Sequence, residues 1–246
     1  MDKLIYIAMS GAKQTLAAQA ANNYNLANAN TTGFKADLTA FQSRPVTGPG
    51  FASRVYATDA TVGYDDTPGV DVTTGDPLDV AVQHQGFIAV QDANGQEAYT
   101  RAGDLHIDPS GLLTTATGYT VIGQDGPISI PPSTSTTIGS DGTVSIVPQG
   151  QTPVTITTVG RIKLVNPPPG SLQKGLDGLY HPVDGEAAPA DPSVTLESGV
   201  LESSNVNLPS CLVNMIELSR QYELQVKSLS TAEQDSASSS KLLQSS

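Results

Sequence analysis

The chain lacks tryptophan, contains a single cysteine, and has few aromatic side chains, which make up 5% of its residues. A lone cysteine, Cys211, excludes an internal disulfide, so the fold does not rest on one. Nothing near Cys211 in the sequence would activate its thiol, and we interpret it as a small helical residue. The scarcity of aromatic residues argues against a substrate pocket, whose walls are usually built from such side chains.

Basic residues are also scarce: 12 Lys and Arg face 24 Asp and Glu, a formal net charge of −12. Proteins that bind nucleic acid or an anionic membrane carry clusters of Lys and Arg, and this sequence has none. We therefore predict no nucleic-acid partner. The acidic residues are concentrated in the middle of the chain, because residues 1–35 hold Lys3, Lys13 and Lys35 against Asp2 alone. An acidic middle suits a solvated outer surface.

No apolar run approaches the ~18 residues that a membrane-spanning helix needs. Residues 4–9 are apolar but few, and Asp2 interrupts the basic region that a secretory signal peptide requires. We expect a protein that is not inserted in a membrane and that has no cleaved signal peptide. If it leaves the cytoplasm, another route must carry it.

The motifs of enzymes and metal sites are missing as well. The sequence has no Gly-x-Ser-x-Gly, no P-loop and no Gly-x-Gly-x-x-Gly. The three histidines form no HxH or HExxH pattern, and residues 92–97 resemble a calcium loop less than a hairpin turn. We predict no catalytic residue, metal, cofactor or small-molecule substrate, and hence no enzyme. The many carboxylates leave a hydrolytic Asp or Glu pair open, because counting does not decide it.

Two helices are predicted at the ends of the chain. Residues 2–33 carry a narrow, alanine-rich stripe with alternating spacings of four and three, the pattern of one helix lying along another. Gly33 stands where a helix would be capped. Residues 205–244 repeat the rhythm, with Asn207 as N-cap and Pro209 in the first turn. The stripes comprise Ile5, Met9, Ala12, Leu16, Gln19, Asn23 and Leu26, then Leu212, Met215, Ser219, Tyr222, Val226 and Leu229.

The middle of the chain, residues 70–204, has the signals of an all-β domain. Short β-branched runs recur every eight to twelve residues, and turn pairs such as Asn94-Gly95, Asp125-Gly126 and Asp141-Gly142 separate them. This spacing favours a sandwich or barrel. Residues 36–69, rich in Gly and Pro, are interpreted as an extended connection. The predicted boundaries are thus 1–35, 36–69, 70–204 and 205–246.

The predicted fold class is α+β, with the terminal helices paired as a coiled-coil-like stalk beside the β-domain. An isolated helix of this length is marginal in water, so each needs a partner, either the other terminus or a neighbouring subunit. Packing of both on one ordinary core is the alternative. A head-to-tail contact that does not close would generate a helical filament. The predicted assembly residues are Ile5, Met9, Ala12, Leu16, Leu26, Leu212, Met215, Tyr222, Val226 and Leu229.

Several strings resemble one family along essentially the whole chain. Residues 25–35 read NLANANTTGFK, residues 198–207 read SGVLESSNVN, and residues 220–223 read RQYE. These strings resemble the signatures of bacterial flagellar rod and hook proteins. The opening residues 1–12 resemble the members of the proximal rod, and the distal-rod paralogue is the alternative. A secreted β-rich module that binds glycan is a further hypothesis, of a different class.

The resemblance implies a structural subunit of the basal body. Family membership implies passage through the flagellar type III export apparatus without a cleaved signal, and assembly in the periplasm with other rod subunits. It also implies that paired terminal helices line a hollow core, that the β-domain faces outward, and that the rod transmits motor torque.

Overall fold

The computed structural model describes residues 4–45, 55–150 and 156–244. The chain divides into two compact units. Unit 1 comprises Met1–Ala29, Asp37–Tyr64 and Val206–Ser246, and unit 2 comprises Asn30–Ala36 and Asp65–Asn205. Both helices of the described residues belong to unit 1, and unit 2 is built from strands, so the predicted α+β class is confirmed.

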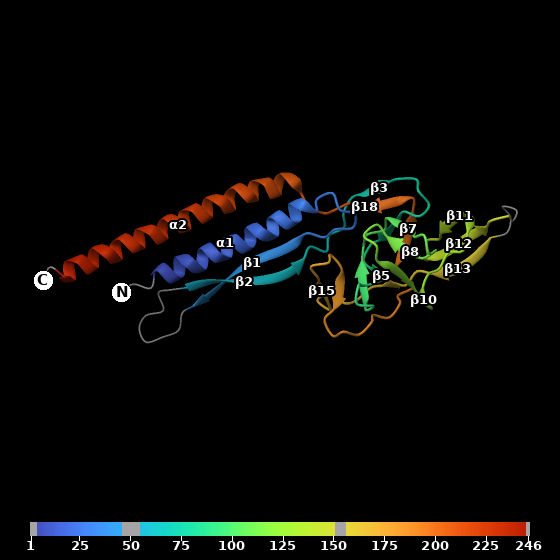
Figure 1. Cartoon of the computed structure of the whole chain (residues 1–246), viewed down its shortest axis with the longest axis horizontal. Helices are drawn as coiled ribbons and strands as arrows, with labels where there is room; N and C mark the ends of the chain where they lie inside the picture. Colours follow the sequence, from blue (N-terminus) through green and yellow to red (C-terminus); the bar gives the residue numbers. More distant parts are fainter. Residues whose placement is uncertain (1–3, 46–54, 151–155, 245–246) are drawn as a thin grey trace. The chain divides into compact units, whose positions relative to one another are not determined.

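Unit 1 contains helices α1, Leu4–Ala27, and α2, Leu208–Gln244, together with a hairpin of strands β1, Asp37–Pro45, and β2, Val55–Tyr64. Helix α1 lies between α2 and the hairpin (Figure 1). The two strands pair antiparallel along their length, with a register shift between Leu38 and Thr39. Residues 36–69 therefore hold a hairpin where we expected an extended connection. Gly48, Pro49 and Gly50 fall in residues 46–54, which lie outside the described residues.

Helix α1 ends at Ala27, and Gly33 is not its cap. The amide of Asn28 donates to Tyr24 O and Asn25 O, and its side chain also donates to Tyr24 O at 2.9 Å. Asparagine competes for backbone groups in this way, so the helix ends early. The N-cap prediction for α2 is confirmed, because Asn207 Oδ1 accepts the amide of Ser210 at 3.0 Å.

Unit 2 contains sixteen short strands within the described residues. They are β3 Asp71–Thr73, β4 Val80–Gln83, β5 Phe87–Gln91, β6 Glu97–Thr100, β7 Leu105–Ile107, β8 Leu113–Thr115, β9 Thr120–Gly123, β10 Gly126–Pro127, β11 Ser133–Ile138, β12 Thr143–Pro148, β13 Thr157–Arg161, β14 Leu164–Val165, β15 Leu172–Lys174, β16 Tyr180–Pro182, β17 Thr195–Ser198 and β18 Val200–Glu202.

The largest sheet has nine strands in the order β15-β16-β6-β5-β9-β8-β7, with β10 beside β9 and β14 beside β5. A separate sheet has the order β11-β12-β13, and two pairs, β17-β4 and β18-β3, join segments from opposite ends of the unit. The predicted turn glycines Gly95, Gly126 and Gly142 have φ of 80°, 120° and 84°. Residues 92–97 form a hairpin turn as predicted, since Asp92 Oδ1 accepts the amides of Asn94 and Gln96 at 2.8 Å.

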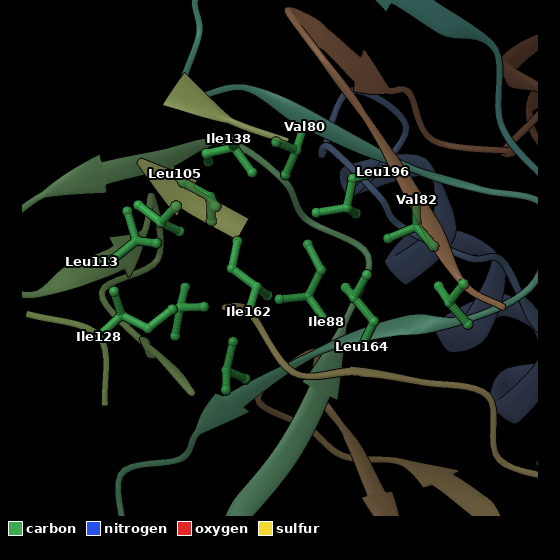
Figure 2. Close-up of a cluster of buried hydrophobic side chains, with 14 of the residues drawn as sticks. Val80, Val82, Ile88, Leu105, Leu113, Ile128, Ile138, Ile162, Leu164 and Leu196 are labelled. Carbon is green, nitrogen blue, oxygen red and sulfur yellow. The ribbon is translucent and has the colours of Figure 1, made fainter. Parts of the chain in front are cut away.

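One hydrophobic core holds these sheets together. Figure 2 shows its side chains converging from several strands, among them Ile88 of β5, Leu113 of β8 and Leu164 of β14. Ile88 and Leu113 have no exposed surface. Burial of such side chains contributes roughly 1.5–3 kcal/mol each relative to exposure, so unit 2 has a core of its own.

We predict that Leu113→Ala lowers the free energy of unfolding by about 2–5 kcal/mol, because the change leaves a cavity in the core. Leu176→Ala is the matched control. Leu176 is fully exposed, so the same truncation should change the free energy by less than about 0.5 kcal/mol. Urea unfolding of both variants measures the difference. Equal effects of the two changes would contradict this description of the core.

Candidate assembly site

Helix α1 buries a stripe of small and polar side chains. The buried residues are spaced four, three, three, four and three apart, which places them on one side of the helix. They are Ala8, Ala12, Thr15, Ala18, Asn22 and Asn25. Side chains this small let a neighbouring helix or strand approach closely. Asn25 clamps the start of β1, because its side chain accepts the amide of Asp37 at 2.8 Å and donates to the carbonyl of the same residue at 3.0 Å.

Helix α2 lies antiparallel to α1. Near the start of α2, Asn22 Nδ2 donates to Cys211 O at 2.9 Å, and farther along, the side chain of Gln225 covers Gly11. The least exposed residues of α2 keep a spacing of four and three from Cys211 onward. They are Cys211, Met215, Leu218, Tyr222, Gln225, Leu229 and Ala232. Cys211 is buried at this contact, and burial raises the pKa of its thiol.

The predicted assembly residues fall into two groups. Ala12 is buried, and the side chains of the others in the first group are half-buried, on the stripes just described or beside them: Ile5, Leu26, Met215, Tyr222 and Leu229. The second group is exposed in the single chain: Met9 at 54%, Leu16 at 47%, Leu212 at 50% and Val226 at 43%. The structure therefore leaves four of the ten predicted assembly residues on the helix surface of the single chain.

Exposed apolar surface and net charge are divided between the units. Within the described residues, eleven of the sixteen exposed large apolar side chains belong to unit 1. Three of them, Leu208, Leu212 and Ile216, are four residues apart and share one face of α2. Unit 1 has 7 acidic and 7 basic residues, whereas unit 2 has 17 acidic and 5 basic ones and carries the whole net charge of −12.

A second constellation, which we name the connector cluster, lies in unit 2. Its residues are Lys35, Ala36, Asp65, Thr67, Gly69, Arg101, Glu202 and Asn205. At its centre, Glu202 is 1% exposed, and its two carboxylate oxygens are divided between two cations. Oε1 accepts from Lys35 Nζ at 3.0 Å and Oε2 from Arg101 Nε at 2.6 Å. The amide of Gly69 donates to Oε1 as well, at 2.8 Å.

The two buried cations of the cluster also donate hydrogen bonds to backbone carbonyls. Arg101 also donates to the carbonyls of Val82, His84 and Gly86 at 2.9–3.1 Å, and Lys35 donates to Thr67 O at 2.7 Å. Such bonds are required, because a buried charge without partners is strongly destabilising. The structure also explains why the family string has a glycine at position 33. The φ of Gly33 is 65°, and a Cβ there would collide with the carbonyl of Arg101.

The pKa values in the cluster follow from this arrangement. Burial would raise the pKa of Glu202, but the Arg101 charge, the Gly69 amide and Lys35 together hold that pKa below its usual value. Burial lowers the pKa of Lys35, and the Arg101 charge lowers it further, against the opposing pull of Glu202. The carboxylate thus stays ionised at neutral pH between two buried cationic side chains.

Asn205 bonds two other segments of the chain, residues 34–36 and residues 65–67. Its amide donates to Phe34 O at 3.2 Å, and its side-chain Oδ1 accepts the amide of Ala36 at 2.8 Å. Its Nδ2 donates to Asp65 O at 2.9 Å and to Thr67 O at 3.0 Å. An asparagine side chain suits this position because it is both donor and acceptor.

Sequence analysis did not identify Asn22, Asn25, Arg101, Glu202 or Asn205 as positioning residues. Hydrophobic periodicity ignores polar side chains, so it assigned no role to Asn22 or Asn25. One signal was available in the composition. The acidic middle region has few Lys and Arg residues, and any of them that is buried needs a carboxylate beside it. The family strings at residues 25–35 and 198–207 also meet in the connector cluster, where Lys35 contacts Glu202.

Comparisons with known proteins agree with this geometry. The chain is 42% identical to the flagellar basal-body rod protein FlgF of Escherichia coli K12, over 99% of each chain, and 42% identical to FlgF of Salmonella typhimurium over the same shares. The chain belongs to the flagellar basal-body rod protein family. The rod protein FlgG of Buchnera aphidicola from Schizaphis graminum is 33% identical, over 85% of this chain and 88% of its own length.

Family models match two parts of this rod-family chain. The flagellar hook protein FlgE/F/G D1 domain matches residues 81–146, which lie in unit 2. The flagellar basal body rod FlgEFG protein C-terminal model matches residues 197–242, which run from β17 through most of α2. Among the described residues, neither helix is long and apolar enough to cross a bilayer, and no three His, Cys, Asp or Glu side chains are grouped to hold a metal ion.

The lone cysteine offers a direct test of the helix contact. We predict that Asn22→Ala raises the rate at which a thiol reagent modifies Cys211 by about fivefold, because one hydrogen bond of roughly 1 kcal/mol no longer opposes opening. Asn23→Ala is the matched control, since Asn23 is exposed on the next position of the same helix. Modification kinetics with a chromogenic disulfide measure both. Equal rates in the two variants would contradict the contact.

A pH prediction follows from Glu202. Its folded-state pKa is lowered, so its contribution is present above the unfolded-state pKa of about 4.3 and is lost as the pH falls through the folded-state value. Glu202→Gln should therefore destabilise unit 2 by about 3–5 kcal/mol at pH 7, and the gap to the wild type should shrink toward pH 2.

Urea unfolding between pH 7 and pH 2 measures that gap. Glu197→Gln serves as control, because the Glu197 side chain is exposed and, among the described contacts, accepts a hydrogen bond only from Gln83. Its gap should be small at every pH. A Glu202→Gln gap that stayed constant across the range would show that the carboxylate charge is not what the cluster stabilises.

Proposed function

We propose that this chain is a structural subunit of the proximal rod of the bacterial flagellar basal body, with no catalytic activity. The observation that carries the proposal is the 42% identity with FlgF along 99% of both chains, against 33% identity with FlgG. The family strings at residues 25–35 and 198–207 contact each other through Lys35 and Glu202, which supports a fold shared with the relatives. The same agreement favours the proximal rod over the distal-rod paralogue.

Polymerisation takes place through unit 1 in this proposal. Helices α1 and α2 pair in a coiled-coil-like manner within one chain, and their outer faces carry the exposed residues Met9, Leu16, Leu212 and Val226 toward neighbouring subunits. Exposed apolar stripes of this kind mark surfaces that other proteins cover. Helix α2 has 37 residues and α1 has 24, so α2 also provides length beyond its partner. An unpaired helix end is marginal in water, and a neighbour would stabilise it.

The distribution of charge supports the same division. Unit 1 is neutral, so copies can pack through it without mutual repulsion, whereas the acidic unit 2 repels its own kind and favours water. We infer that unit 2 faces outward. The family relationship further supports export through the flagellar type III apparatus without a cleaved signal, assembly in the periplasm, and transmission of motor torque by the finished rod.

Aspartate substitutions on the exposed helix faces test the proposal. We predict that Leu16→Asp and Val226→Asp each abolish swimming and rod growth. The wild-type side chains are half-exposed, so an aspartate is solvated in the single chain and becomes costly only where a neighbour buries it. Swimming in soft agar and electron microscopy of basal bodies measure the outcome in cells whose own copy is deleted.

The matched control is Leu176→Asp, which introduces the same charge at an exposed leucine of unit 2. This variant should swim normally. Purified Leu16→Asp should also melt within a few degrees of the wild type, because unit 2 retains its core. Normal rods in the Leu16→Asp and Val226→Asp strains would refute assembly through these faces.

A further inference from the structure

Three of the four places where the chain passes between the units are joined at the connector cluster. The chain leaves unit 2 after Ala36, returns at Asp65, and leaves again after Asn205. These three residues are bonded directly, since the amide of Asp65 donates to Ala36 O at 2.8 Å and the amide of Ala36 donates to Asn205 Oδ1 at 2.8 Å. The connections to β1, from β2 and to α2 therefore start from one bonded point of unit 2.

The buried charged side chains of the connector cluster bond residues next to Ala36, Asp65 and Asn205. Lys35, next to Ala36, is bonded to Glu202, three residues before Asn205, and to Thr67, two residues after Asp65. Lys174 Nζ donates to Lys35 O at 2.7 Å and stands 3.7 Å from the centre of the Phe34 ring. Each connection is thus anchored by a charged group and tied to the others by Asn205.

We propose that Asn205 is the positioning residue of this joint: its side-chain amide makes the three connections turn together when unit 2 is twisted. The inference rests on the proposed function, because a subunit of a rotating shaft has to pass a twist between its parts. Without the amide, the segments at Ala36 and at residues 65–67 lose their common partner. The backbone bonds from Asp65 to Ala36 O and from Asn205 to Phe34 O remain, so the three connections are coupled less tightly. The core of unit 2 does not use Asn205 and stays intact.

Hydrogen exchange on the purified chain tests the joint itself. Asn205→Ala should accelerate exchange of the Ala36 and Asp65 amides by about tenfold or more, because several bonds are lost together. Amides of the core such as Ile88 should exchange as in the wild type. Asn205→Asp keeps the acceptor for the Ala36 amide, so that amide should stay protected. It loses the donor to the carbonyls of Asp65 and Thr67, so exchange of the Asp65 amide should accelerate through the loosening of residues 65–67.

A general loss of stability would accelerate exchange of both amides in both variants. It would not produce this difference between Asn205→Ala and Asn205→Asp. Asn94→Ala, in an exposed turn of unit 2, is the matched control and should leave all these amides unchanged. Acceleration of all amides alike in Asn205→Ala, or no acceleration at Ala36, would overturn the proposal.

Swimming under load tests the role of the joint in the cell. Asn205→Ala chains should enter rods in normal amounts, judged by immunoblots of purified basal bodies, and swim at near wild-type speed in dilute medium. In medium thickened with a viscous polymer, swimming should fall several-fold more than in the wild type or in Asn94→Ala. Equal decline in all strains would overturn the joint, whereas absence of the wild-type chain from basal bodies would instead overturn the proposed function.

Discussion

Unit 2 depends on keeping one carboxylate charged where water does not reach. Glu202 is compensated by Lys35, by Arg101 and by the Gly69 amide, so its desolvation is offset only when the three segments that carry these groups are in place. Lys35 and Glu202 stand 167 positions apart in the chain. A bond of this kind carries a steep penalty for partial assembly, because the loss of one partner leaves an unpaired charge. The cluster therefore makes the ends of unit 2 fold together or not at all.

Much of the fold could be predicted because it depends on local chemistry. The glycines of the Asn-Gly and Asp-Gly pairs adopt the positive φ that such turns need, and Asn207 caps α2 as its side chain allows. The face of α1 could not be predicted, because alanines occur on every side of that helix and the large side chains Met9 and Leu16 outweigh them in any periodicity. The helix buries Ala8 and Ala18, where close approach is possible. The connector cluster escaped prediction for a different reason: its bonds join distant positions, and no spacing rule relates them.

The difference between the predicted stripe of α1 and the stripe that it buries within the chain bears on the proposed assembly. A helix that buries its small residues against its own chain and leaves Met9 and Leu16 outside uses one face for the fold and keeps a second, apolar face exposed, which the proposed assembly would use. Had Met9 and Leu16 packed internally, α1 would expose less apolar surface. The neutral charge of unit 1 fits this use, since like charges would oppose the stacking of identical faces.

The polar contacts between the helices make the internal pairing specific. Alanine-lined helices can slide along each other at little cost, because the surfaces are smooth and their contacts are nearly equivalent at successive turns. Asn22 removes that freedom, since a shift would leave its buried amide without Cys211 O and cost about 1–3 kcal/mol. Asn25 does the same between α1 and β1. The large apolar side chains on the outer faces are then presented at fixed positions along the helices, which identical neighbours require if each is to meet the next in the same register.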